Sequence, residues 1–88
     1  MELGTVIDAL YASEINCSIT SFWDGGIVVK LGDVMNGFKA ERECATAAEA
    51  AEFLDHAARE HYPESCYTLG KAEWERRNQG LKDRHKNN

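Results

Sequence analysis

Two histidines and a cysteine near the middle of the chain are residue types that could bind a transition metal. They are His56, His61 and Cys66. If residues 46–62 form a helix, positions five apart differ by about 140° around its axis, so the two imidazoles would not point at one ion. The chain contains no Cys-x-x-Cys or His-x-x-x-His spacing. We therefore expect no metal site and no other cofactor.

Cys44 and the acidic residues are the groups that could take part in catalysis. Cys44 comes just before a predicted helix, whose dipole would favour a thiolate, but the sequence places no base beside it. Glu41 and Glu43 both lie on the solvated side of a predicted strand. General acid–base catalysis needs burial to shift carboxylate pKa values, so these two residues are not expected to be catalytic. We expect a structural cysteine and a non-catalytic protein.

The C-terminal end combines basic residues with an aromatic residue. The candidate contacts there are Trp74, Arg76, Arg77, Lys82 and Arg84. Basic side chains near an aromatic ring can hold single-stranded nucleic acid by phosphate contacts and base stacking. A tail that keeps the protein soluble or screens its acidic body is the simpler interpretation, so nucleic-acid binding is the alternative function.

Charge is unevenly distributed along the 88 residues. Residues 1–70 contain four Lys/Arg and twelve Asp/Glu, a net charge of −8, whereas residues 71–88 have a net charge of +3. An acidic body repels polyanions, which argues against nucleic acid and anionic membranes as partners. No membrane span or signal peptide is evident, and three widely spaced cysteines fit a reducing compartment. We expect a cytoplasmic protein.

Residues 15–31 form two alternating apolar runs joined by Asp24-Gly25-Gly26, which predicts a β-hairpin. If those three residues form the loop, Trp23 faces Ile27 across the hairpin. Trp23 and Ile19 then point toward the core. A slip of one residue would turn these side chains to the wrong face.

The same register pairs Phe22 with Val28 on the opposite, outer sheet face, beside Lys30. These three residues are the candidate partner-binding site. Two alternatives remain open at this point: the C-terminal segment folds back and covers them, or they bind another protein or a second copy.

Residues 38–44 predict a third strand, with Phe38 on the buried face. Its register against the second strand is open. The pairing that packs Phe38 best places Lys30 opposite Lys39. A shift of two residues places Lys30 opposite Glu41 at the expense of that packing.

Two amphipathic helices flank the strands. Apolar spacing predicts the first over residues 2–13. Thr46 and Glu49 form a capping box that begins the second, which Pro63 ends near Tyr62. The predicted fold class is α+β with the order αβββα: a three-stranded antiparallel sheet with both helices on one face.

One domain accounts for residues 1–66, because a chain of this length has room for a single core. Residues 67–88 are expected to form a C-terminal extension. It is predicted to be helical over residues 71–79, around Trp74, and disordered from Leu81 onward.

This order of elements is similar to the topology of double-stranded-RNA-binding domains. The resemblance implies lysine contacts at the start of the second helix and a histidine in the loop between the first two strands. Here those positions hold Thr46-Ala47-Ala48-Glu49-Ala50 and Asp24-Gly25-Gly26, so the RNA-contact motifs are missing.

Three further runs resemble a group of small bacterial and phage-type proteins whose activity is not known. The runs are Tyr11-Ala12-Ser13-Glu14-Ile15-Asn16, Ser21-Phe22-Trp23-Asp24-Gly25-Gly26 and Lys30-Leu31-Gly32-Asp33. This resemblance implies no site. The leading hypothesis is therefore a small non-catalytic module that binds a protein partner or forms a homodimer through the outer sheet face.

Overall fold

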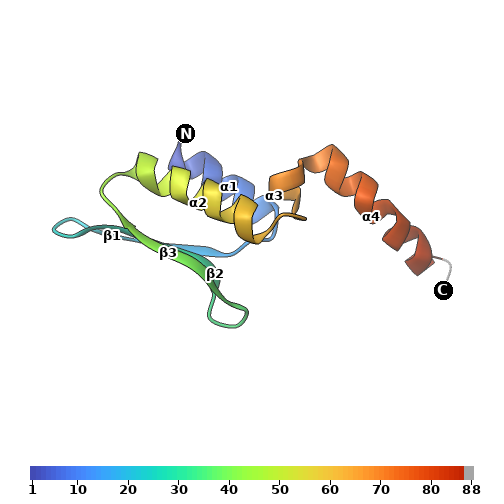
Figure 1. The fold of residues 1–88 in the computed structure, drawn as a ribbon, viewed down its shortest axis with the longest axis horizontal. Coiled ribbons are helices and arrows are strands. Elements are labelled where there is room, and N and C mark those ends of the chain that lie inside the picture. Colours follow the sequence, from blue (N-terminus) through green and yellow to red (C-terminus); the bar gives the residue numbers. More distant parts are fainter. Residues whose placement is uncertain (87–88) are drawn as a thin grey trace.

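The structure, a computed structural model, describes the backbone of residues 1–86 and the side chains of residues 1–79 (Figure 1). The elements in chain order are α1 (Leu3–Ala12), β1 (Cys17–Phe22), β2 (Gly26–Asp33), β3 (Gly37–Cys44), α2 (Ala47–His61), α3 (Cys66–Leu69) and α4 (Lys71–Lys86). The three strands form one antiparallel sheet in the order β1-β2-β3.

Both long helices of the body lie on the same side of this sheet (Figure 1). Helix α2 packs over β2 and β3, and α1 packs against α2. The α+β class and the helix-strand-strand-strand-helix order predicted from the sequence are confirmed. The opposite side of the sheet has no helix over it in the described part of the chain (Figure 1).

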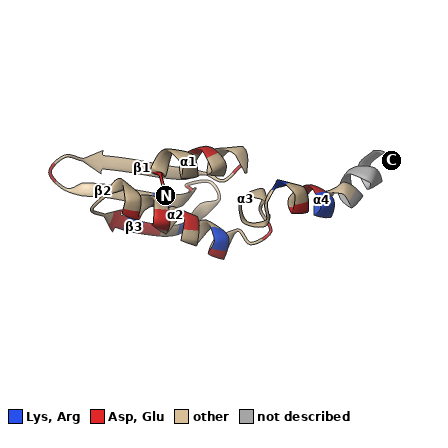
Figure 2. Cartoon of the chain, turned by 90° about the horizontal axis from the view of Figure 1, so that it is seen from above, with Lys and Arg blue, Asp and Glu red and all other residues tan. Residues whose placement is uncertain are grey.

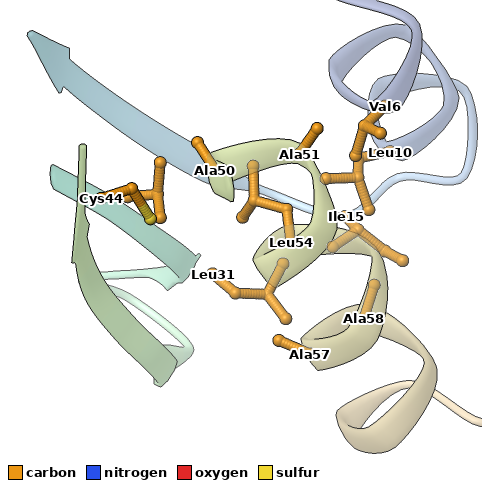
Figure 3. Packing of buried hydrophobic residues seen from close by; sticks show 11 residues of the cluster. Val6, Leu10, Ile15, Leu31, Cys44, Ala50, Ala51, Leu54, Ala57 and Ala58 are labelled. Atoms are coloured by element: carbon orange, nitrogen blue, oxygen red, sulfur yellow. The ribbon is translucent and has the colours of Figure 1, made fainter. Parts of the chain in front are cut away.

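The core is built around the alanine-rich face of α2. Thr46 caps this helix by accepting from the Glu49 amide at 3.2 Å, and the Glu49 carboxylate accepts from the Ala45 amide at 2.9 Å. Small side chains let the helix approach the sheet closely. The buried cluster comprises Val6, Leu10, Ile15, Val29, Leu31, Cys44, Ala50, Ala51, Leu54, Ala57 and Ala58 (Figure 3).

The first hairpin has a register two residues away from the predicted one. Ile19 pairs with Val29, and Phe22 pairs with Gly26, so residues 23–25 form the loop. Gly26 has a φ of +101°, in the region that favours glycine. Because the shift is even, Ile19 keeps its place on the helix side. Trp23 becomes a loop residue that is 98% exposed, so the prediction that it faces the core was wrong.

Strand β3 pairs with β2 in the second of the two registers considered. Lys30 lies opposite Glu41, and their side chains form an ion pair at 4.0 Å. Opposite charges directly across an antiparallel pair stabilise it, whereas Lys30 opposite Lys39 would not.

A β-bulge reconciles this register with the short β2–β3 turn. Gly32 pairs with Phe38 although Leu31 pairs with Ala40, so Lys39 is an extra residue in β3. The extra residue places Phe38 on the outer sheet face, beside Lys30. The prediction that Phe38 faces the core was therefore wrong.

Helix α1 ends at a residue with unusual backbone geometry. The Ile15 amide donates to the Leu10 carbonyl at 2.9 Å and the Glu14 amide donates to the Tyr11 carbonyl at 3.1 Å, the pattern of a Schellman motif. Glu14 occupies the left-handed position, with a φ of +61°, where glycine is usual. This ending turns the chain so that Ile15 is buried, only 6% exposed.

Replacing Glu14 by glycine is expected to raise the free energy of unfolding by about 0.5–1 kcal/mol, because glycine adopts positive φ without steric cost. Urea denaturation followed by circular dichroism measures the change. Glu52→Gly, at an exposed interior position of α2, should lower stability by about 1 kcal/mol. A loss of stability in both variants would contradict the strain assigned to Glu14.

The C-terminal extension is attached to the helix side of the body. The Tyr67 hydroxyl donates to the Asp55 carboxylate at 2.6 Å, and the Arg59 guanidinium lies 5.3 Å from the centre of the Tyr67 ring. Burial and the bond to Asp55 raise the pKa of the Tyr67 phenol. Helix α3 therefore packs on α2, away from the outer sheet face.

Helix α4 extends away from the body and continues to Lys86 (Figure 1). The sequence predicted a helix only over residues 71–79 and disorder from Leu81; the structure instead places residues 81–86 in the helix. Residues 87–88 lie outside the described residues. Of the two alternatives left open for the outer sheet face, coverage by the C-terminal segment does not occur in the described chain.

Candidate functional site

The three predicted partner-binding residues lie on the outer sheet face, but they are arranged differently from the prediction. Val28 is opposite Thr20, and Phe22 is opposite Gly26, so Phe22 and Val28 are diagonal neighbours. Diagonal neighbours are still within reach of an aromatic ring. Lys30 follows Val28 on the same face of the central strand, because side chains alternate along a strand.

Lys30 is held in place by its two neighbours on β3. Its ammonium group lies 5.2 Å from the centre of the Phe38 ring and 4.0 Å from the Glu41 carboxylate. Both contacts attract the ammonium group, each by about 1 kcal/mol or less at a solvent-exposed position. The apolar and charged contacts on the outer sheet face therefore involve Phe22, Val28, Lys30, Phe38 and Glu41, and Ser18, Thr20 and Glu43 share this face.

This surface has two exposed aromatic rings around a partly buried centre. Phe22 is 53% exposed and Phe38 is 46% exposed, whereas Val28 and Lys30 are half-buried. Large apolar side chains left open on a sheet face are typical of binding surfaces. The structure brings together all three predicted residues and adds Phe38, which the sequence reasoning had placed in the core.

The two hairpin turns beside this face carry further exposed apolar side chains. Trp23 is in the β1–β2 turn, and Val34 and Met35, 84% and 91% exposed, are in the β2–β3 turn. A shallow hollow at the first turn is lined by Phe22, Trp23 and Glu43, among others. The sequence reasoning missed Trp23 as a surface residue, because an alternating pattern does not show where a turn begins.

The β2–β3 turn is organised by Asp33. Its carboxylate accepts from the Asn16 side chain at 2.7 Å and from the Asn36 amide at 2.7 Å, and the Asn36 side chain donates to it as well. The Asn16 bond is the largest cause that lowers the Asp33 pKa, to about 2 from the ordinary 3.8, followed by the bonds from Asn36. These bonds join the start of β1 to the turn.

Lowering the pH is expected to weaken the β2–β3 turn, and to do so at a lower pH than the ordinary pKa of an aspartate would suggest. The folded pKa of Asp33 is below the ordinary value, so its contribution is complete above about pH 4 and is lost as the pH falls toward 2. In a carboxyl-detected NMR titration, Asp33 should titrate near 2 in the wild type. In Asn16→Ala its midpoint should move toward the ordinary value. A midpoint near 3.8 in the wild type would contradict this assignment.

The residues considered for catalysis and metal binding are dispersed. Cys44 is buried at 3% exposure, and Glu41 is paired with Lys30. His56 is exposed beside Glu60, at 4.0 Å, and His61 is exposed at the end of α2. Among the described residues, no group of three His, Cys, Asp or Glu side chains could hold a metal ion.

The basic residues of the tail are partly neutralised by neighbouring carboxylates. Arg76 bonds Glu73 at 2.6 Å, and Arg77 bonds both Glu73, at 2.8 Å, and Glu64, at 2.6 Å. The bonds from Arg76 and Arg77 lower the Glu73 pKa to about 2. Trp74 is half-buried. The side chains of Lys82 and Arg84 lie outside the described residues.

Comparison with family models, with curated proteins and with solved structures finds no match to this chain. No helix in residues 1–86 combines the length and the apolar character needed to cross a bilayer.

Proposed function

We propose that this chain is a small non-catalytic module that binds a protein partner, or a second copy of itself, through the outer sheet face. The observation that carries the proposal is the exposure of Phe22 and Phe38 on a sheet face over which no described helix lies. At the centre of the face Val28 lies between Thr20 and Glu43, and Lys30 contacts Phe38 and Glu41. Such a surface suits a protein partner with its own apolar patch and an acidic or carbonyl group for Lys30.

The proposed location is the cytoplasm. All three cysteines are free: Cys17 and Cys66 are half-buried and Cys44 is buried. Free cysteines are typical of a reducing compartment, where disulfides do not persist. Burial also raises the pKa of the Cys17 thiol, which makes it less reactive at neutral pH.

Duplex RNA is not the proposed ligand, although the order of elements is like that of double-stranded-RNA-binding domains. Helix α2 begins with the capping pair Thr46 and Glu49, and the Glu49 carboxylate is held by the Ala45 amide. A carboxylate at this position would repel phosphate.

Single-stranded nucleic acid bound by the tail is the alternative proposal. Arg76 and Arg77 would have to leave their bonds to Glu73 and Glu64 to contact phosphates, which weakens this proposal. It predicts salt-sensitive binding that is lost when residues 71–88 are deleted. No gel shift at low salt would exclude it.

Replacing Phe22 by glutamate is expected to abolish binding through the outer sheet face, because a charge in the contact would lose its hydration without gaining a partner. Affinity capture from the native cell and sedimentation of the purified chain measure the effect. Tyr11→Glu is the matched control, since Tyr11 is an 85% exposed aromatic residue on α1. Circular dichroism should show both variants folded. If Phe22→Glu keeps the same partner recovery and the same sedimentation as the wild type, the proposal is wrong.

A further inference from the structure

Strand β1 has one backbone side without a partner. In the described part of the chain it pairs only with β2. On the side facing β2, the Gly32 amide donates to the Asn16 carbonyl at 2.7 Å. Along an antiparallel strand, every second residue directs its N–H and C=O groups toward the neighbouring strand, and the residues between direct theirs away from it. Asn16 and every second residue after it in β1 therefore face β2. The N–H and C=O groups of Cys17, Ile19 and Ser21 therefore point toward the free edge of β1.

The two edges of the sheet differ in charge. Strand β1 reads CSITSF and has no charged side chain, whereas β3 reads GFKAEREC. Figure 2 shows β1 uncoloured along its length and acidic residues on β3. An antiparallel copy on β3 would set Glu41 against Glu41 if the two-fold axis lay at Glu41, and Arg42 against Arg42 if it lay at Arg42. A register centred on Ala40 would instead set Lys39 against Glu41. Like charges directly opposite destabilise a strand pair, so charge restricts the registers in which β3 can pair with itself, whereas β1 has no charged side chain that restricts its pairing.

We propose that two copies of this chain pair antiparallel through the free edge of β1, forming a continuous six-stranded sheet about a two-fold axis at Ile19. In this register Ile19 lies opposite Ile19 of the second copy, and Cys17 lies opposite Ser21. In this register Cys17, Ile19 and Ser21 all form backbone hydrogen bonds with the second copy. A shift of two residues would leave one of the three without such a bond. This edge is separate from the outer sheet face, so the inference stands whether or not that face binds a partner.

Side chains on both faces of the new strand pair are compatible. On the helix side, Cys17 and Ile19 are only partly buried against the core, and the second copy would cover them. On the outer side, Ser18 faces Thr20 of the second copy in a non-bonded pair, where side chains are closest and hydroxyls can bond each other. No two like charges are brought together between the paired strands.

Replacing Ser21 by proline tests the edge directly. Proline removes an N–H that points away from β2, so the monomer fold is retained, as is usual for proline on an edge strand. Each dimer loses two N–H donors, and the dimer dissociation constant is expected to rise roughly tenfold or more. Sedimentation across a concentration series measures it. Glu43→Pro is the matched control, because its N–H is on the free side of β3, and its dimer should persist.

Amide hydrogen exchange of the wild-type chain provides a test that needs no variant. The Cys17 and Ile19 amides should be protected at concentrations where the dimer forms and exchange freely on dilution. Phe22→Glu should remain a dimer, which separates this edge from the outer sheet face. The inference is overturned if the wild type is monomeric throughout, if these amides are never protected, or if Phe22→Glu dissociates the dimer while Ser21→Pro does not.

Discussion

Replacing Leu54 by alanine is expected to remove about 3 kcal/mol from the free energy of unfolding, a large part of the roughly 4–13 kcal/mol expected for a domain of this size. Leu54 is fully buried, at 0% exposure, in the cluster between α2 and the sheet (Figure 3). The variant loses the transfer free energy of the removed carbons and leaves a cavity. The other buried residues of α2 are alanines, and their methyl groups are too short to fill this cavity.

Urea denaturation followed by circular dichroism measures this loss, and the midpoint of thermal unfolding should fall by roughly 12–24 °C. Leu69→Ala is the matched control, because the same atoms are removed from a half-buried position on α3. It should cost about 1 kcal/mol. Equal losses in the two variants would mean that Leu54 is not at the centre of the core.

Replacing Gly32 by alanine is expected to cost roughly 2–3 kcal/mol and to disturb the outer sheet face. Gly32 has a φ of +105°, and an added Cβ would collide with the Gly37 carbonyl oxygen and lie 3.1 Å from the Phe38 Cα. Both neighbours are backbone atoms of the bulge and cannot rotate away. The β-bulge would have to open, moving Phe38 from its place over Lys30.

Gly37→Ala separates the collision from the backbone preference. Gly37 also has a positive φ, +90°, but an added Cβ would meet nothing within 4 Å. It should cost only about 1 kcal/mol. Urea denaturation gives both values, and the ring-current shift of the Lys30 side-chain protons should be lost in Gly32→Ala alone. Equal costs with the ring-current shift retained would contradict this account of the bulge.

Local patterns in the sequence were sufficient to predict every element of the body. The capping pair Thr46 and Glu49 and the alanine face behind it predicted α2, because these interactions lie within one or two helical turns. The alternation along β1 and β2 predicted the faces of Ile19, Val28 and Lys30 correctly, because an even shift in register preserves the face of every side chain.

The sequence determined which elements form and which side of β1 and β2 meets the helices, because those features depend on residues close together in the chain. Only the tertiary structure decided where Trp23 and Phe38 lie. Trp23 depends on where the first turn begins, and Phe38 depends on a bulge that forms when Lys30 pairs with Glu41 across the sheet. Register is chosen by contacts between strands, and these contacts exist only once the strands are side by side.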